Sequence, residues 1–239
     1  MKKRILYAAI IIVVGIALAI GLSATLSVSK YGIIKGKITD ELSGDPIKGV
    51  RIRVDGKSTI LYHSKYYQFT GIPPGKQNIE VFPPPGWVKF TKTIKVKPGE
   101  NEVNISLKGD KIPDLTKIIC FTESKKRGII VEIRYVDSKG VGITEFPRLP
   151  VKIEVVLWER IGEEDNYVKG NKLFEGTIEH FWDSDAYLAK NKGILSWSEI
   201  PIKFEDKKRG IMEIRVHLEQ GDFKDTVDDV SLFPEEEEE

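Results

Sequence analysis

An uncharged apolar run near the N-terminus restricts the fold of this chain more than any other feature. Residues 5–22 are ILYAAIIIVVGIALAIGL, and no charged side chain follows until Lys30. A helix over residues 5–26 would be about 33 Å long, which matches a hydrocarbon core of about 30 Å. Because lipid offers the backbone no hydrogen-bond partners, a spanning segment of this kind must be helical. Residues 1–30 are therefore predicted to form a transmembrane anchor that contacts membrane lipid through residues 5–26.

The charges beside this run predict its orientation. Lys2, Lys3 and Arg4 precede it, and cations in this position favour the cytoplasmic side. We therefore expect a single-pass protein of the cell membrane, with a cytoplasmic N-terminus and extracytoplasmic domains. A signal peptide cleaved near Ala24 is the alternative. The run is longer than a typical signal h-region and ends in a poor cleavage site, which favours a retained signal-anchor.

The amino-acid composition indicates which partners to expect and how the folded domains are stabilised. The 37 basic residues nearly cancel the 36 acidic ones, so nucleic acid is not expected as a partner. A single cysteine, Cys120, excludes an intramolecular disulfide. The abundance of Lys and Glu resembles the ion-pair-rich surfaces of heat-adapted, thermophile-like proteins.

Residues 31–108 show short alternating segments that are separated by Gly and Pro. Strands are predicted at residues 32–40, 50–56, 66–72 and 77–87, with two more within residues 90–107. Short strands at this spacing are typical of an antiparallel Greek-key sandwich. The chain is accordingly predicted to be all-β after its anchor.

Three phrases of this region match one known pattern in order and spacing. They are GKITDELSGDPIKGVRIRV, FTGIPPGKQNIEVFPPPGW and KTIKVKPGENEVNISL. Residues 32–108 resemble the carboxypeptidase regulatory-like domain, which has a transthyretin-like (prealbumin-like) sandwich. The chain departs from the family at residues 62–66, where members usually carry an Asp-Gly turn. The resemblance implies a non-catalytic module for display, spacing or binding, and it supplies no catalytic residue.

The C-terminal half predicts a second sandwich without a recognisable family. A polar linker at residues 109–117 precedes it, and residues 118–233 are expected to form an immunoglobulin-like antiparallel sandwich. Strands are predicted at residues 129–140, 151–160, 172–182, 194–204, 210–223 and 226–233. A short helix is considered only at residues 183–191. We recognise no family over residues 115–233, and the acidic tail at residues 234–239 is predicted to be disordered.

No pattern in the chain indicates catalysis. The histidines, His63, His180 and His217, are scattered and match no metal-binding spacing. His217 is expected on a strand surface or edge, and His180 half-buried beside aromatic residues. We therefore predict a protein that is not an enzyme and needs no cofactor.

Several residues remain as candidate sites. Glu179, Asp183 and Asp185, with Asp225, Asp228 and Asp229 later, could offer oxygen ligands to calcium, although acidic loop residues are usually just solvated. Tyr66 and Trp87 are candidate ligand-binding aromatics, and Trp87 is expected to be exposed because it follows three prolines. Aromatic residues in sandwiches more often pack internally. Asn104 begins an N-x-S triplet for glycosylation, but it lies in a predicted strand.

Together these features predict a membrane-anchored, extracytoplasmic and non-enzymatic cell-surface protein. It would act as a structural or protein-interaction module whose partner is an envelope protein or a polysaccharide. Two alternatives stay open: a carbohydrate-binding module or adhesin, and an accessory subunit of an exported peptidase or envelope complex.

Overall fold

The fold is built from strands, as the sequence predicts. The computed structural model describes residues 30–163, 166–183, 185–201 and 208–234. Within these ranges the only helical element is η1 (Trp197–Glu199), a single 3-10 turn, and no helix there is long and apolar enough to span a bilayer. The predicted membrane anchor and all but the first residue of the acidic tail lie outside the described residues.

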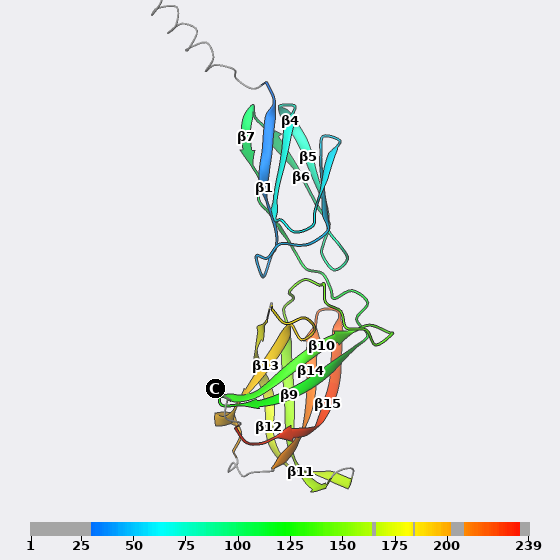
Figure 1. Cartoon of the computed structure of the whole chain (residues 1–239), viewed down its shortest axis with the longest axis vertical. Coiled ribbons are helices and arrows are strands. Elements are labelled where there is room, and N and C mark those ends of the chain that lie inside the picture. The colour runs from blue at the N-terminus through cyan, green and yellow to red at the C-terminus, as the bar shows by residue number, and fades with distance from the viewer. Residues whose placement is uncertain (1–29, 164–165, 184, 202–207, 235–239) are drawn as a thin grey trace, which may run out of the picture. The chain divides into compact units, whose positions relative to one another are not determined.

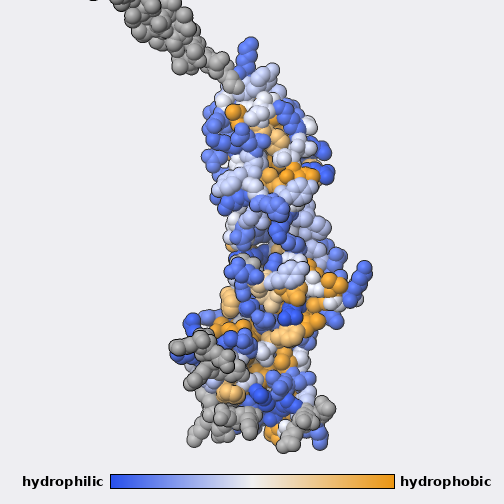
Figure 2. Space-filling view, viewed as in Figure 1, coloured by the Kyte–Doolittle hydropathy of each residue, from blue (hydrophilic) through white to orange (hydrophobic). Residues whose placement is uncertain are grey.

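The chain divides into two compact units, which we describe separately. The first contains the described residues up to Thr39 together with Pro46–Phe82 and Lys89–Ile105. The second contains Asp40–Asp45, Pro83–Val88 and the described residues from Ser106 onward. On the face drawn in Figure 2, hydrophilic residues predominate and apolar residues form small separate patches.

The first unit is a β-sandwich of two sheets (Figure 1). One sheet has the order β4 (Tyr66–Ile72), β1 (Gly32–Asp40) and β7 (Gly99–Glu102), and β8 (Ile105–Leu107) also pairs with β1. The other has the order β3 (Lys57–Leu61), β2 (Val50–Val54), β5 (Gly75–Phe82) and β6 (Phe90–Val96). Val50, Ile52 and Val54 are fully buried, whereas the arginines between them are exposed. This alternation places one face of β2 in the core.

Two local features of this sandwich differ from the sequence prediction. Strand β3 was not predicted, because Leu61 is its only buried residue and its alternation is weak. It follows β2 through Asp55 and Gly56, which both have positive φ (48° and 72°), as a two-residue hairpin requires. In addition, β1 pairs with β7 in parallel, with Gly32 opposite Gly99, although an antiparallel sandwich was expected.

The second unit is one continuous antiparallel sheet rather than two separate sheets. Its order is β15 (Gly221–Ser231), β14 (Arg209–Leu218), β11 (Lys152–Glu163), β12 (Asn166–Trp182), β13 (Asn191–Ser196), β10 (Gly128–Val136) and β9 (Lys117–Lys125). The long strand β12 pairs with β11 as far as Ile178, and with β13 from Glu179 onward. One strand therefore joins both halves of the sheet, where an immunoglobulin-like fold would separate them.

Side chains also connect the two edge strands of this sheet. The backbone N–H of Cys120 on β9 donates to Asp225 Oδ2 on β15 at 2.6 Å. The hydroxyl of Ser124 on β9 donates to the carbonyl of Ser231 on β15, also at 2.6 Å. The sheet thus curls around a single core, which includes Ile129, Val131, Ile133, Ile153, Leu157, Ile214 and Val216.

Three further predictions for this unit are corrected. The predicted strand at residues 210–223 is a hairpin, because β14 ends at Leu218 and β15 begins at Gly221. Strand β9 was not predicted. The short helix considered at residues 183–191 does not form in the described residues there, which have irregular backbone up to the start of β13.

Candidate functional site

A hollow of about 430 Å³ lies on the outer face of strands β12, β11, β14 and β15. Two rows of side chains cross the four strands in register. One row contains Thr177, Glu154, Arg215 and Lys224, and the next contains Glu175, Val156, Glu213 and Thr226. We call this set of eight residues the four-strand hollow.

Strand alternation explains why charged side chains line this hollow. Met212, Ile214 and Val216 on β14 are buried in the core, so Glu213 and Arg215 between them face outward. The same alternation on the neighbouring strands brings hydroxyl, carboxylate and cationic groups onto one surface.

Each glutamate of the hollow is paired with a lysine of the same sheet. Glu154 pairs with Lys152, Glu175 with Lys172, and Glu213 with Lys169. The pairs are solvent-exposed, so each adds little stability. Their main effect is local, because they neutralise the carboxylates and hold them in place.

Trp158 lies two residues beyond Val156 on β11, next to one end of the hollow and outside its lining. Its indole Nε1 donates to Glu213 Oε2 at 3.2 Å. The ammonium groups of Lys169 and Lys172 each lie 5.5 Å from its ring centroid, within cation–π range. The Lys169 ammonium and, second, the Trp158 indole lower the pKa of Glu213, so that carboxylate stays ionised.

His217 lies at the other end, between two carboxylates. Its Nε2 is 2.9 Å from Glu154 Oε2, and its Nδ1 is 2.8 Å from Asp222 Oδ1. Glu154 first and Asp222 second raise the pKa of the imidazole above its usual 6.5. Lys152 and then His217 lower the pKa of Glu154 to about 2. His217 lies near the surface, as expected. Its strand β14 pairs with β11 on one side and β15 on the other, so it is not an edge strand.

A second hollow, of about 600 Å³, lies on the first unit. Tyr66, one of the candidate ligand-binding residues, lines it and is 66% exposed. The Lys65 ammonium lies 5.8 Å from the Tyr66 ring centroid. We call this surface the Tyr66 hollow.

The glycosylation candidate Asn104 lines the same hollow but does not lie in a strand. It falls between β7 and β8, and its side-chain amide is already bonded. Asn104 Oδ1 accepts the Lys37 backbone N–H at 3.0 Å, and its Nδ2 donates to Glu102 Oε1 at 2.9 Å. Modification of Asn104 would break the second bond, and it stays a prediction.

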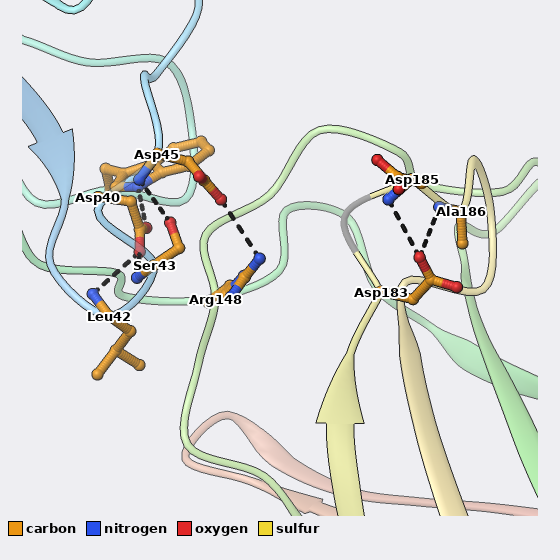
Figure 3. Close-up of polar contacts among 9 residues, drawn as sticks. Asp40, Leu42, Ser43, Asp45, Arg148, Asp183, Asp185 and Ala186 are labelled. Atoms are coloured by element: carbon orange, nitrogen blue, oxygen red, sulfur yellow. Dashed lines mark hydrogen bonds and ion pairs between the residues drawn. The ribbon is translucent and has the colours of Figure 1, made fainter.

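Trp87 is not the exposed aromatic that the sequence suggested. It is half-buried, and its Nε1 donates to Asp40 Oδ2 at 2.9 Å. The buried Asp40 also accepts the backbone N–H groups of Leu42 and Ser43 through Oδ1 (Figure 3). The indole therefore satisfies a buried carboxylate, which explains why a Trp in a proline-rich loop turns inward.

The acidic candidates for calcium are engaged separately. Asp183 Oδ1 accepts the backbone N–H groups of Asp185 and Ala186 (Figure 3), and its Oδ2 lies 3.0 Å from Lys192 Nζ. That ammonium lowers the pKa of Asp183. Glu179 is exposed on β12. In the part of the chain that the structure describes, no three His, Cys, Asp or Glu side chains converge to hold a metal ion.

The later acidic candidates have other roles. Asp225 joins β15 to β9, and Asp229 Oδ1 lies 2.9 Å from an Arg160 nitrogen. Asp228 is exposed. His180 is half-buried, as expected, with Nδ1 3.5 Å from Asn191 Nδ2, and His63 is exposed.

Arg215 and Lys224 are not among the sequence-predicted site residues, although the alternation in EIRVHL and DFKDT places both outward. The missing information was the hairpin between β14 and β15, which pairs them.

Comparisons with known proteins give similarity only at low levels. No protein-family model matches the chain, and no curated protein matches it. Among solved structures, the chain is similar to a candidate carbohydrate-binding protein from Bacteroides uniformis at 14% identity and a TM-score of 0.30, covering 82% of this chain and 98% of that one. A DUF3823 family protein from Parabacteroides merdae has 15% identity and a TM-score of 0.29, and the match covers 85% of this chain and 99% of that one. A streptococcal ancillary pilin has 10% identity and a TM-score of 0.30, and the match covers 86% of this chain and 61% of that one.

Proposed function

We propose that this chain is a non-enzymatic surface module that a helix over residues 5–26 holds in the membrane. The first domain, with its carboxypeptidase regulatory-like sequence pattern, acts as a spacer. The second domain contacts a polar component of the cell envelope through the four-strand hollow. The observation that supports this proposal best is the lining of that hollow, in which cationic, carboxylate and hydroxyl groups surround one depression.

The same lining favours binding over catalysis. A general base needs a nitrogen or oxygen that is free to take the proton of the reacting group. Both ring nitrogens of His217 already contact carboxylates of the same sheet, at 2.9 and 2.8 Å. The hydroxyl groups of the hollow belong to Thr177 and Thr226, on β12 and β15, whereas the described bonds of His180 and His217 go to other residues.

The anchor is tested by fractionating the full chain and a variant that lacks residues 1–29. We expect the full chain to remain with membranes through an alkaline wash and to be released by detergent. The shortened chain should be soluble and folded. Membrane partitioning of the shortened chain, or release of the full chain by the wash, would show that residues 5–26 are not the anchor.

The binding surface is tested by filling the hollow without removing a charge that it already has. Thr177→Met places a longer, uncharged side chain inside it, and Thr91→Met places the same side chain on exposed β6 as the matched control. We expect the first variant to lose binding to an isolated envelope fraction and the control to keep it. Equal binding by both variants would reject the hollow as the contact surface.

A second candidate function is carbohydrate binding at the Tyr66 hollow. The exposed ring of Tyr66 in a depression is an arrangement on which a sugar can stack. Glycan-array binding that is lost in Tyr66→Ala and kept in Tyr62→Ala, an equally exposed tyrosine outside the hollow, would support this function. Array signals that are unchanged in Tyr66→Ala would reject it.

A further inference from the structure

Two cations lie side by side in the four-strand hollow without a carboxylate partner. Arg215 on β14 is directly opposite Lys224 on β15. Both side chains are exposed and line the hollow. Within the residues that the structure describes, neither forms a hydrogen bond or an ion pair. Like charges directly opposite each other in a sheet are destabilising, so this pair costs the fold stability.

The neighbouring carboxylates are directed to other partners than the two cations. Glu154 is directly opposite Arg215 on β11, yet its Oε1 lies 2.6 Å from Lys152 and its Oε2 lies 2.9 Å from His217. Asp225, which follows Lys224, directs its Oδ2 to the Cys120 backbone N–H on β9.

The same holds for the next row of the hollow. Glu213 Oε1 contacts Lys169, and its Oε2 accepts the Trp158 indole N–H. Lys224 acts on Glu213 only through its charge, as the last of the causes that lower the pKa of that carboxyl group. Among the described residues, Arg215 and Lys224 thus present two unpartnered positive charges beside carboxylates that each contact another cation or an N–H group.

We propose that Arg215 and Lys224 bind the anionic groups of an acidic polysaccharide, carboxylate or sulfate. This inference rests on the proposed function and names the ligand class for the same hollow. The guanidinium fork of Arg215 matches a planar carboxylate or two oxygens of a sulfate group, and Lys224 adds a second charge. Thr177 and Thr226 offer hydroxyl groups at the rows' ends, which suit the hydroxyl groups of a sugar.

The test uses the full chain in detergent and probes that differ in charge alone. Polygalacturonate oligosaccharides supply carboxylates, and their methyl esters keep the backbone without the charge. Sulfated and neutral dextran form the corresponding pair for sulfate. We expect binding to at least one anionic probe and none to its neutral counterpart, with affinity that falls as salt is added.

The variant Arg215→Gln/Lys224→Gln removes the two cations. Its matched control is Lys126→Gln/Arg127→Gln, which removes the same charge from two exposed neighbours at the β9–β10 turn. We expect the first variant to bind at least about tenfold more weakly and the control to bind as the unaltered chain does. Because the substitution also removes a repulsion, its thermal midpoint should be equal or higher, so weaker binding does not reflect unfolding.

Four results would overturn the inference: unchanged binding by the Arg215/Lys224 variant, equal loss in the control variant, equal binding of neutral and anionic probes, or preferential binding to anionic lipid vesicles.

The envelope assay separates this inference from the proposed function. If Thr177→Met abolishes envelope binding while Arg215→Gln/Lys224→Gln keeps it, the hollow is the contact surface and the acidic ligand class is wrong. If neither variant affects envelope binding, the proposed contact surface itself is wrong.

Discussion

The carboxylate of Asp225 on β15 accepts the backbone N–H of Cys120 on β9 at 2.6 Å. These strands form the two ends of the seven-strand order in the second unit. An edge strand presents unpaired N–H and C=O groups, which need partners or protection. Here a side chain supplies the partner, and the Ser124 bond to Ser231 supplies another. The sheet is therefore joined at this seam by side-chain bonds.

Removing this carboxylate should destabilise the second unit. Asp225→Ala leaves the Cys120 N–H without its acceptor, and an unsatisfied buried donor costs about 1–3 kcal/mol. We expect the free energy of unfolding, measured by urea denaturation, to fall by that amount. Asp228→Ala on the same strand, where the carboxylate is exposed, is the control and should change little. Equal stability of the two variants would show that the seam bond is not important.

The thiol of Cys120 should report on the same seam. Burial first, and the nearby Asp225 charge second, raise the pKa of this thiol. Since the thiolate is the reactive form, we expect very slow labelling by iodoacetamide at pH 8 in the native protein and fast labelling in urea. Asp225→Ala should accelerate native labelling, because the seam opens more often. Rapid labelling of the unaltered native protein would contradict the buried position.

The bridge of His217 to Glu154 and Asp222 predicts a pH-dependent contribution to stability. The raised pKa of the imidazole means that its contribution is complete below pH 6.5, its ordinary pKa, and is lost as pH rises through the folded-state value. The lowered pKa of Glu154 means that its contribution is present above its ordinary 4.5 and is lost as pH falls toward about 2. The contributions of His217 and Glu154 to stability are therefore both complete between about pH 4.5 and 6.5.

The measurement compares the unaltered chain with His217→Gln from pH 5 to pH 9. The stability difference between them should shrink as pH rises above 6.5. His63→Gln, which changes an exposed histidine of the first unit, is the matched control and should change the free energy of unfolding little. An NMR titration that places the His217 midpoint below 6.5 would reverse the sign and refute the prediction.

Trp87 should contribute to stability and not to ligand binding. Trp87→Phe keeps an aromatic ring but removes the N–H that the buried Asp40 carboxylate accepts at 2.9 Å. Hydrogen bonds to charged groups contribute about 1.5–3 kcal/mol, and we expect a loss of that size in urea denaturation. Binding to the envelope fraction should be unchanged per folded molecule. A variant with full stability and lost binding would restore Trp87 as a ligand-binding residue.

Much of the strand pattern was predictable because alternation is a local property. The strand predicted at residues 32–40 is β1, and Val50, Ile52 and Val54 are buried as their spacing indicates. β3 was not predicted because only one of its residues is buried, so its sequence does not alternate between apolar and polar residues. The parallel pairing of β1 with β7 joins residues more than 60 positions apart, so no local signal reports it.

The candidate site was less predictable than the fold. Tyr66 and Asn104 were singled out separately, and the structure brings them to one hollow. Asp183, one of the acidic candidates, accepts backbone N–H groups and contacts Lys192. The eight residues of the four-strand hollow come from four strands, and their shared position depends on cross-strand register.

The all-β class, the buried faces of the regular strands and the expectation of an apolar anchor over residues 5–26 can be read from the amino-acid sequence. Each follows from the spacing or length of apolar residues along the chain. The folded structure was needed to show that β9 meets β15 through Asp225, that Trp87 turns inward to Asp40, and that Arg215 lies beside Lys224 without an ion-pair partner among the described residues. These relationships depend on strand register and on competition among charged groups for partners, which are set when distant segments pack together.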